Sequence, residues 1–219
     1  MTSSPPRRSH RRRAVLVPVA AAVMAAGIGA TALLGGFAEA ADEPPPEVKP
    51  ETIVDQGQFT TTFAKATDTV EKNEFGDSKR YLSLVLKVVN QSDKTVSVGI
   101  MREPGSRILP IVTSYTQSIL RVRPEIKTPY GPDVSVSGSG VQSKQLQPGI
   151  PATVVIKYQL DPAAAAPKSV TVDVGSMVLD EVGLVDQTQY WHLVGEGDVD
   201  AFVPTVAAEV TLPVERGNG

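Results

Sequence analysis

The fold class follows from one segment, Tyr81-Leu82-Ser83-Leu84-Val85-Leu86-Lys87-Val88-Val89-Asn90. Its leucines at positions 82, 84 and 86, together with Val88, recur at every second residue. Successive side chains of an extended chain point to opposite sides, so these four share one face, and polar or β-branched residues occupy the other. Such alternation predicts a β-strand with a half-buried to fully buried face.

Shorter segments on both sides repeat this pattern. They are bounded by Gly, Pro, Asn, Asp and Ser, and we expect strands at 59–63, 96–100, 108–113, 118–122, 152–160, 169–174 and 207–212. Residues 68–77 read as a polar break, and residues 124–140 as a long irregular loop. Residues 161–166 read as a single helical turn capped by Asp161. Many short strands with almost no helical periodicity predict an all-β domain, built as an antiparallel β-sandwich.

Two motifs give a resemblance to a known family. The first strand described above ends in Val89-Asn90-Gln91-Ser92-Asp93, and the turn Leu146-Gln147-Pro148-Gly149 precedes the strand at 152–160. Residues 57–175 thereby resemble the immunoglobulin-like domains of bacterial, actinobacterial-type, membrane-anchored extracytoplasmic proteins of unknown function. The resemblance implies an immunoglobulin-like sandwich and supplies no catalytic residue. Residues 180–204 depart from the family pattern and are interpreted as an extension.

The N-terminal region predicts export. Residues 14–37 carry no charge and are long enough to cross a bilayer, whose core needs roughly 20 apolar residues. Five arginines lie within residues 1–13, which predicts that this tail stays cytoplasmic and the rest of the chain is extracytoplasmic. Two interpretations remain open. Residues 14–37 are either an uncleaved single-pass anchor in the cell membrane, or part of a signal peptide cleaved after Ala40, which would release a secreted protein.

Composition limits the partners. Residues 38–56 are rich in Pro and Glu and predict an extended linker, followed by a domain at 57–219. Beyond residue 37 the chain has 16 basic and 24 acidic side chains, a formal charge of −8, which disfavours nucleic acid as a partner. The chain has no cysteine, so packing and strand pairing must hold the domain together.

Tyr190-Trp191-His192 is the one dense aromatic group. An exposed Tyr190 and Trp191 could stack on sugar rings or anchor a protein partner, while the alternative is that Trp191 fills the core. His192 is the only histidine after the tail and would have to serve as the base of any Ser-His-Asp site, but the sequence has no Gly-x-Ser-x-Gly motif. A single histidine, with Met101 and Met177, is too few ligands for zinc or copper.

Acidic residues supply two weak calcium candidates. Glu196, Asp198 and Asp200 alternate and would project from one side of an extended segment. A second group, between the first two long strands, contains Asp68, Glu71, Glu74 and Asp77. Neither group has EF-hand spacing, and the alternative for both is a solvated acidic surface.

These observations predict a non-catalytic extracytoplasmic binding module without a cofactor, whose partner is another envelope protein. Recognition of carbohydrate or cell wall through Tyr190 and Trp191 is the alternative.

Overall fold

The computed structural model describes residues 44–72, 76–128, 130–138, 143–183 and 186–217. The first half of this part of the chain contains β1 (Glu47–Val48), β2 (Ile53–Asp55), β3 (Phe59–Lys72), β4 (Ser78–Asn90), β5 (Val96–Ser97), β6 (Ile111–Val112), the 3-10 helix η1 (Tyr115–Ser118) and β7 (Ile119–Arg123). The second half contains β8 (Asp133–Ser137), β9 (Gln145–Leu146), β10 (Pro151–Leu160), β11 (Ser169–Gly175), β12 (Met177–Glu181), β13 (Gln189–Leu193), β14 (Gly195–Glu196), β15 (Val203–Pro204) and β16 (Val206–Arg216). The all-β prediction is therefore confirmed for the described residues.

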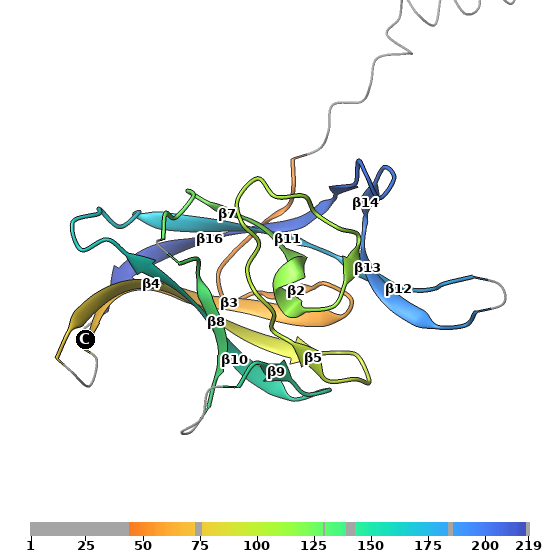
Figure 1. The fold of residues 1–219 in the computed structure, drawn as a ribbon, viewed down its shortest axis with the longest axis horizontal. Helices are drawn as coiled ribbons and strands as arrows, with labels where there is room; N and C mark the ends of the chain where they lie inside the picture. Colours follow the sequence, from red (N-terminus) through yellow and green to blue (C-terminus); the bar gives the residue numbers. More distant parts are fainter. Residues whose placement is uncertain (1–43, 73–75, 129, 139–142, 184–185, 218–219) are drawn as a thin grey trace, which may run out of the picture. The chain divides into compact units, whose positions relative to one another are not determined.

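The long strands form two antiparallel groups. One has the order β8-β10-β4-β3, and the other has the order β7-β11-β16. The groups join where Val214–Arg216 of β16 runs parallel to Ala66–Asp68 of β3. Both groups curl, as Figure 1 shows. Three small sheets complete the pairing, with the orders β12-β13-β6, β14-β15 and β5-β9.

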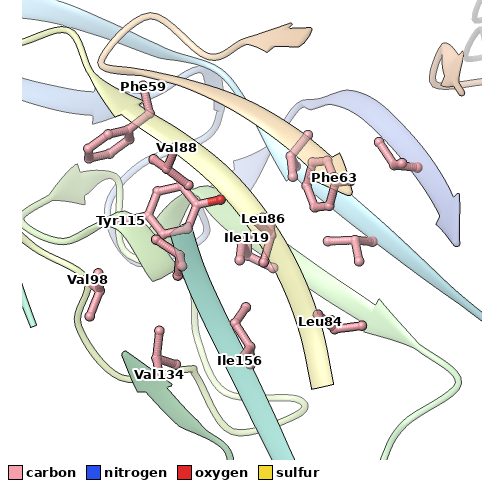
Figure 2. Close-up of a cluster of buried hydrophobic side chains, with 14 of the residues drawn as sticks. Phe59, Phe63, Leu84, Leu86, Val88, Val98, Tyr115, Ile119, Val134 and Ile156 are labelled. Carbon is pink, nitrogen blue, oxygen red and sulfur yellow. The ribbon is translucent and has the colours of Figure 1, made fainter. Parts of the chain in front are cut away.

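One hydrophobic core fills the space between the two groups. The alternating residues of β4 are buried as the sequence predicts, with Leu82, Leu86 and Val88 fully inaccessible to solvent. Figure 2 shows their neighbours pointing into the same cluster, among them Ile156 of β10 and Ile119 of β7. Tyr115 of η1 also belongs to the cluster. Its ring packs edge-to-face against the ring of Phe59, with 5.2 Å between the ring centroids. Because side chains from both groups enter this cluster, neither group buries its apolar face alone.

Asn90 explains why the β4 segment ends in the motif that the sequence presents. Its amide nitrogen donates to the carbonyl oxygens of Lys94 at 2.7 Å and Leu146 at 3.1 Å. Its amide oxygen accepts from the backbone nitrogen of Ser92 at 3.0 Å and the Ser92 hydroxyl at 2.7 Å. The fully buried side chain thereby fixes the turn after β4 and ties it to β9. Only a side chain with both a donor and an acceptor end can do this.

The strand pairing begins earlier in the chain than the sequence suggests. The sequence predicts an extended linker up to residue 56. Within that range, however, β1 pairs with β16 and β2 pairs with β3. Val54 and Gln56 are buried, and the Gln56 amide donates to the carbonyl of Gly175. A proline-rich segment suits a sheet edge, where a missing backbone donor does little harm.

Three local predictions are wrong. The polar break predicted at 68–77 begins too early, because β3 continues to Lys72 and pairs with β4 there, with its polar side chains at the surface. Residues 124–140 contain β8, which pairs with β10. Its alternation is only a few residues long, and the Pro, Gly and Ser around it hide the signal. Residues 161–166 form a turn without a helix, because the Asp161 side chain accepts from the Ala163 backbone nitrogen and the Asp161 carbonyl accepts from Ala164. The guanidinium of Arg80 then donates to the Ala164 carbonyl.

No helix in the described part of the chain has the length and apolarity that crossing a bilayer requires. The predicted membrane segment at 14–37 and the tail at 1–13 lie outside the described residues.

Replacing Asn90 by Asp tests the role of this side chain. The substitution keeps the acceptor for Ser92 but turns an acceptor toward the carbonyls of Lys94 and Leu146. We expect a loss of about 2 kcal/mol or more in the free energy of unfolding, measured by urea at pH 7. The control is Ser92→Ala, which removes one donor and should cost about 1 kcal/mol. Equal losses in the two variants would contradict the assigned role.

Candidate functional site

The sheet formed by β6, β13 and β12 carries most of the residues that the sequence singles out. Its register places Val112 beside Trp191 and Ile111 beside His192, while β12 places Leu179 beside Trp191 and Val178 beside His192. Because side chains alternate across a strand, this defines two faces. The inner face holds Val112, Met177, Trp191 and Leu193, and also Leu179, which lies beyond the core and is 47% exposed. The outer face holds Ile111, Val178, Asp180, Tyr190 and His192.

Tyr190 and Trp191 consequently point to opposite faces. Trp191 is partly buried and packs against the core, as one of its two sequence interpretations has it. Tyr190 lies on the outer face beside His192, with 5.8 Å between the ring centroids. The structure does not bring the two rings into one platform, so a sugar ring could not stack on both.

The outer face combines exposed aliphatic side chains with polar ones. Ile111 is 53% exposed and Val178 is 43% exposed, and both flank His192 across neighbouring strands. Val182 follows β12 at the same side-chain period and is 58% exposed. Asp180 lies between Val178 and Val182 along the strand and is paired with Tyr190, so the aliphatic side chains surround the Asp180 and His192 pair.

His192 is engaged at both ring nitrogens. Its Nε2 lies 3.6 Å from the Asp180 carboxylate, across the register of the sheet, and its Nδ1 lies 3.1 Å from the carbonyl oxygen of Leu193. A Ser-His-Asp site needs one ring nitrogen on the nucleophile and the other on the carboxylate. Among the described residues, the contacts of His192 are with Asp180 and the Leu193 carbonyl on the surface of the sheet.

A pocket of about 240 Å³ lies near this sheet. It is lined by Ile100, Arg102, Arg107, Leu109, Ser114, Thr116 and Gln117. These residues come from the segment between β5 and β6 and from η1 with the residue before it. Gln117 holds the backbone before η1 in place, because its side-chain oxygen accepts hydrogen bonds from the backbone nitrogens of Thr113 at 2.6 Å and Ser114 at 2.9 Å.

Arg102 is the half-buried cation of the pocket. Its Nη2 donates to the carbonyl oxygen of Ile119 at 3.1 Å. Its Nη1 is fully buried and has no hydrogen-bond partner among the described residues. Burial lowers the pKa of the guanidinium from its ordinary value, because desolvation disfavours the charged form.

Arg107 also lines the pocket, and it forms hydrogen bonds with the segment that contains the first calcium candidate, Glu196, Asp198 and Asp200. It donates to the carbonyl oxygen of Val199 and to the Asp200 carboxylate, the latter at 2.8 Å. The backbone turns here, since the Ala201 nitrogen donates to the Asp198 carbonyl, so the expected extended segment is absent. Glu196 lies in β14. No group of three acidic or histidine side chains in the described residues is arranged for a metal ion.

In the second acidic cluster, Asp68 and Glu71 pair with different basic residues. Asp68 accepts two hydrogen bonds from Arg80, at 2.8 and 2.6 Å, and Glu71 pairs with Lys157 at 2.7 Å. Asp77 lies in the described part of the chain, and Glu74 lies outside it. The Arg80 hydrogen bonds hold the pKa of Asp68 below its usual value, so its carboxylate serves the ion pair.

The chain matches no family model, and no curated protein matches its sequence.

Sequence reasoning missed Arg102 and Arg107. Both flank the Pro104-Gly105 turn, which gives a local excess of positive charge in an acidic domain. This excess of positive charge is the only feature of the sequence that points to a site at these two arginines. The other walls of the pocket come from η1, a 3-10 helix that the sequence pattern does not predict.

A substitution at Gly57 tests how closely the backbone packs against Met177 and Trp191 of the inner face. It has φ +84°, and an added Cβ would lie 2.0 Å from the carbonyl oxygen of Met177 and 3.5 Å from the Trp191 ring. Gly57→Ala should lower the free energy of unfolding by about 3 kcal/mol or more and change Trp191 emission. Gly76→Ala is the matched control, because its φ is +86° but its Cβ would meet open space. It should cost about 1 kcal/mol. Equal losses would show that no collision occurs at Gly57.

Asp68→Asn tests the ion pair with Arg80. A carboxyl group whose pKa is lower in the folded state stabilises the protein above its unfolded pKa, and this contribution is lost as pH falls through the folded pKa. Asp68→Asn should therefore cost about 1–2 kcal/mol at pH 7. It should also reduce the fall in stability below about pH 4. Urea unfolding from pH 2.5 to 7 measures both, and an unchanged pH profile would contradict the assignment.

Proposed function

We propose that the protein is a non-catalytic extracytoplasmic interaction module, with an immunoglobulin-like sandwich that binds another envelope protein through the outer face of the β6-β13-β12 sheet. The observation that carries this function is the exposed aliphatic surface of Ile111 and Val178 beside Tyr190. Exposed aliphatic side chains grouped on one face suit contact with a partner, which would remove them from water. Tyrosine beside aliphatic side chains is a common composition for the centre of an interface.

The strand order supports the immunoglobulin-like part of the proposal. Immunoglobulin constant-type domains pair strands A, B, E and D in one sheet and C, F and G in the other. Numbered along the chain, β3, β4, β7, β8, β10, β11 and β16 take the places of A to G. The groups β3-β4-β10-β8 and β7-β11-β16 then have the same order. The outer face is formed by β12 and β13, in the connection between the sixth and seventh of these strands, and by Ile111 of β6, in the connection between the second and third.

The position of the module at the membrane rests on the sequence. Residues 1–13 remain in the cytoplasm, and residues 14–37 either stay in the membrane as an anchor or are removed by cleavage after Ala40. In both cases the domain works outside the cytoplasmic membrane. The glycan-binding alternative is not carried forward, because Tyr190 and Trp191 lie on opposite faces of the sheet.

The absence of cysteine from the chain allows a direct experiment. Val178→Cys places a single thiol on the outer face, and Val70→Cys places one at a 50% exposed position on β3. Intact cells expressing each full-length variant are treated with a maleimide photo-crosslinker that does not cross the cytoplasmic membrane. We expect both variants to be labelled and only Val178→Cys to form a discrete cross-linked product after illumination.

The outcomes separate the two parts of the proposal. Labelling that requires cell lysis would contradict export. Labelling of both thiols on intact cells, with identical cross-linking patterns, would contradict the outer face as the binding surface.

A further inference from the structure

We propose that the pocket between Arg102 and Arg107 binds a small aliphatic carboxylate. The inference concerns a ligand for the purified protein and goes beyond the proposed interaction with an envelope partner. It does not depend on that interaction.

The charge of the pocket is opposite to that of the domain. Its lining contains two arginines and no acidic side chain. The chain beyond residue 37 has a formal charge of −8, so a concave surface lined by two arginines, of which only Arg107 is paired with an acidic side chain among the described residues, is a local exception. Such a pocket concentrates positive potential where solvent is partly excluded, which favours an anion over a neutral or cationic ligand.

Arg102 provides the strongest indication of the ligand class. A guanidinium has five N–H donors, and a buried donor without an acceptor is costly. The Nη1 of Arg102 is buried and has no protein acceptor in the described residues, and no carboxylate forms an ion pair with this arginine there. A ligand carboxylate in the pocket supplies the countercharge that this arginine lacks.

Arg107 can join without a large penalty. Its present partner, Asp200, has a side chain that is 95% exposed. Ion pairs this exposed contribute little to stability, so a carboxylate in the pocket can compete for Arg107. Arg102 then holds the ligand at the buried end, and Arg107 covers it at the opening.

The apolar lining and the volume define the rest of the ligand. Ile100 is 84% exposed and Leu109 is 52% exposed, and both line the pocket. A short branched alkyl group would cover them and remove apolar surface from water. At about 240 Å³ the pocket is smaller than the usual range for drug-sized ligands, roughly 300–1,000 Å³, so the ligand has few heavy atoms.

Isovalerate is the probe, added to the full chain in lipid nanodiscs and followed by saturation-transfer difference NMR. Isopentanol has the same branched chain without the charge and reports non-specific partition into lipid. Inorganic phosphate, followed by its competition with isovalerate, reports a general anion site. We expect saturable binding of isovalerate and weak or absent binding of the other two.

Arg102→Met removes the guanidinium and keeps an apolar stem, and it should weaken isovalerate binding about tenfold or more, the factor for losing a charge-assisted hydrogen bond. Arg107→Met should weaken it less. Lys127→Met is the control, because it removes an exposed cation outside the pocket lining and should leave binding unchanged. Thermal unfolding checks each variant, and Arg107→Met carries the test if Arg102→Met does not fold.

The proposal is overturned by any of three results. These are an absence of saturable isovalerate binding, unchanged binding by folded variants at both arginines, or phosphate that competes as an equally strong ligand.

Discussion

Strand β4 is the element on which the rest of the structure depends, because it is paired along its length on both sides. Its register runs from Ser78 to Asn90 against β3 and from Arg80 to Val89 against β10. A slip of one residue on either side would turn the leucines of β4 away from the core. At one end of β4, the Asn90 side chain ties the following turn to β9. At the other end, Arg80 binds Asp68 of β3 and the Ala164 carbonyl after β10.

Both candidate binding surfaces lie in connections between the long strands of the core. The segment between β5 and η1 contributes the pocket together with η1 itself. The segment between β11 and β16 contributes the outer face together with Ile111 of β6. β6 links them, since it pairs with β13 and belongs to the same connection as Arg102 and Arg107. Both surfaces are therefore set by a few backbone hydrogen bonds. This arrangement is usual for binding sites, which loops carry on a packed scaffold.

Long strands with a strict alternation could be predicted from the sequence, and the reason is visible in burial. The 152–160 segment became β10, with Val154 and Ile156 fully buried, and the 169–174 segment became β11. The β8 segment and the η1 helix could not be predicted, because each is short and its conformation is decided by neighbours far away in the sequence. The opposite directions of Tyr190 and Trp191 did follow from strand alternation once the strand was known. What the sequence lacked was a signal that Gln189–Leu193 is a strand.

The two candidate surfaces differ in what they imply about selection on the chain. An apolar face on a small sheet can arise without a function, but it carries a risk of aggregation that polar substitutions would remove at little cost. Arg102 is harder to explain by packing alone, because a methionine could fill much of the same space without leaving a buried donor unpaired. Its Nη2 contact to the Ile119 carbonyl accounts for one donor group and leaves the other unexplained. A carboxylate ligand in the pocket accounts for a half-buried arginine without an acidic partner among the described residues and for the absence of acidic side chains from the pocket lining.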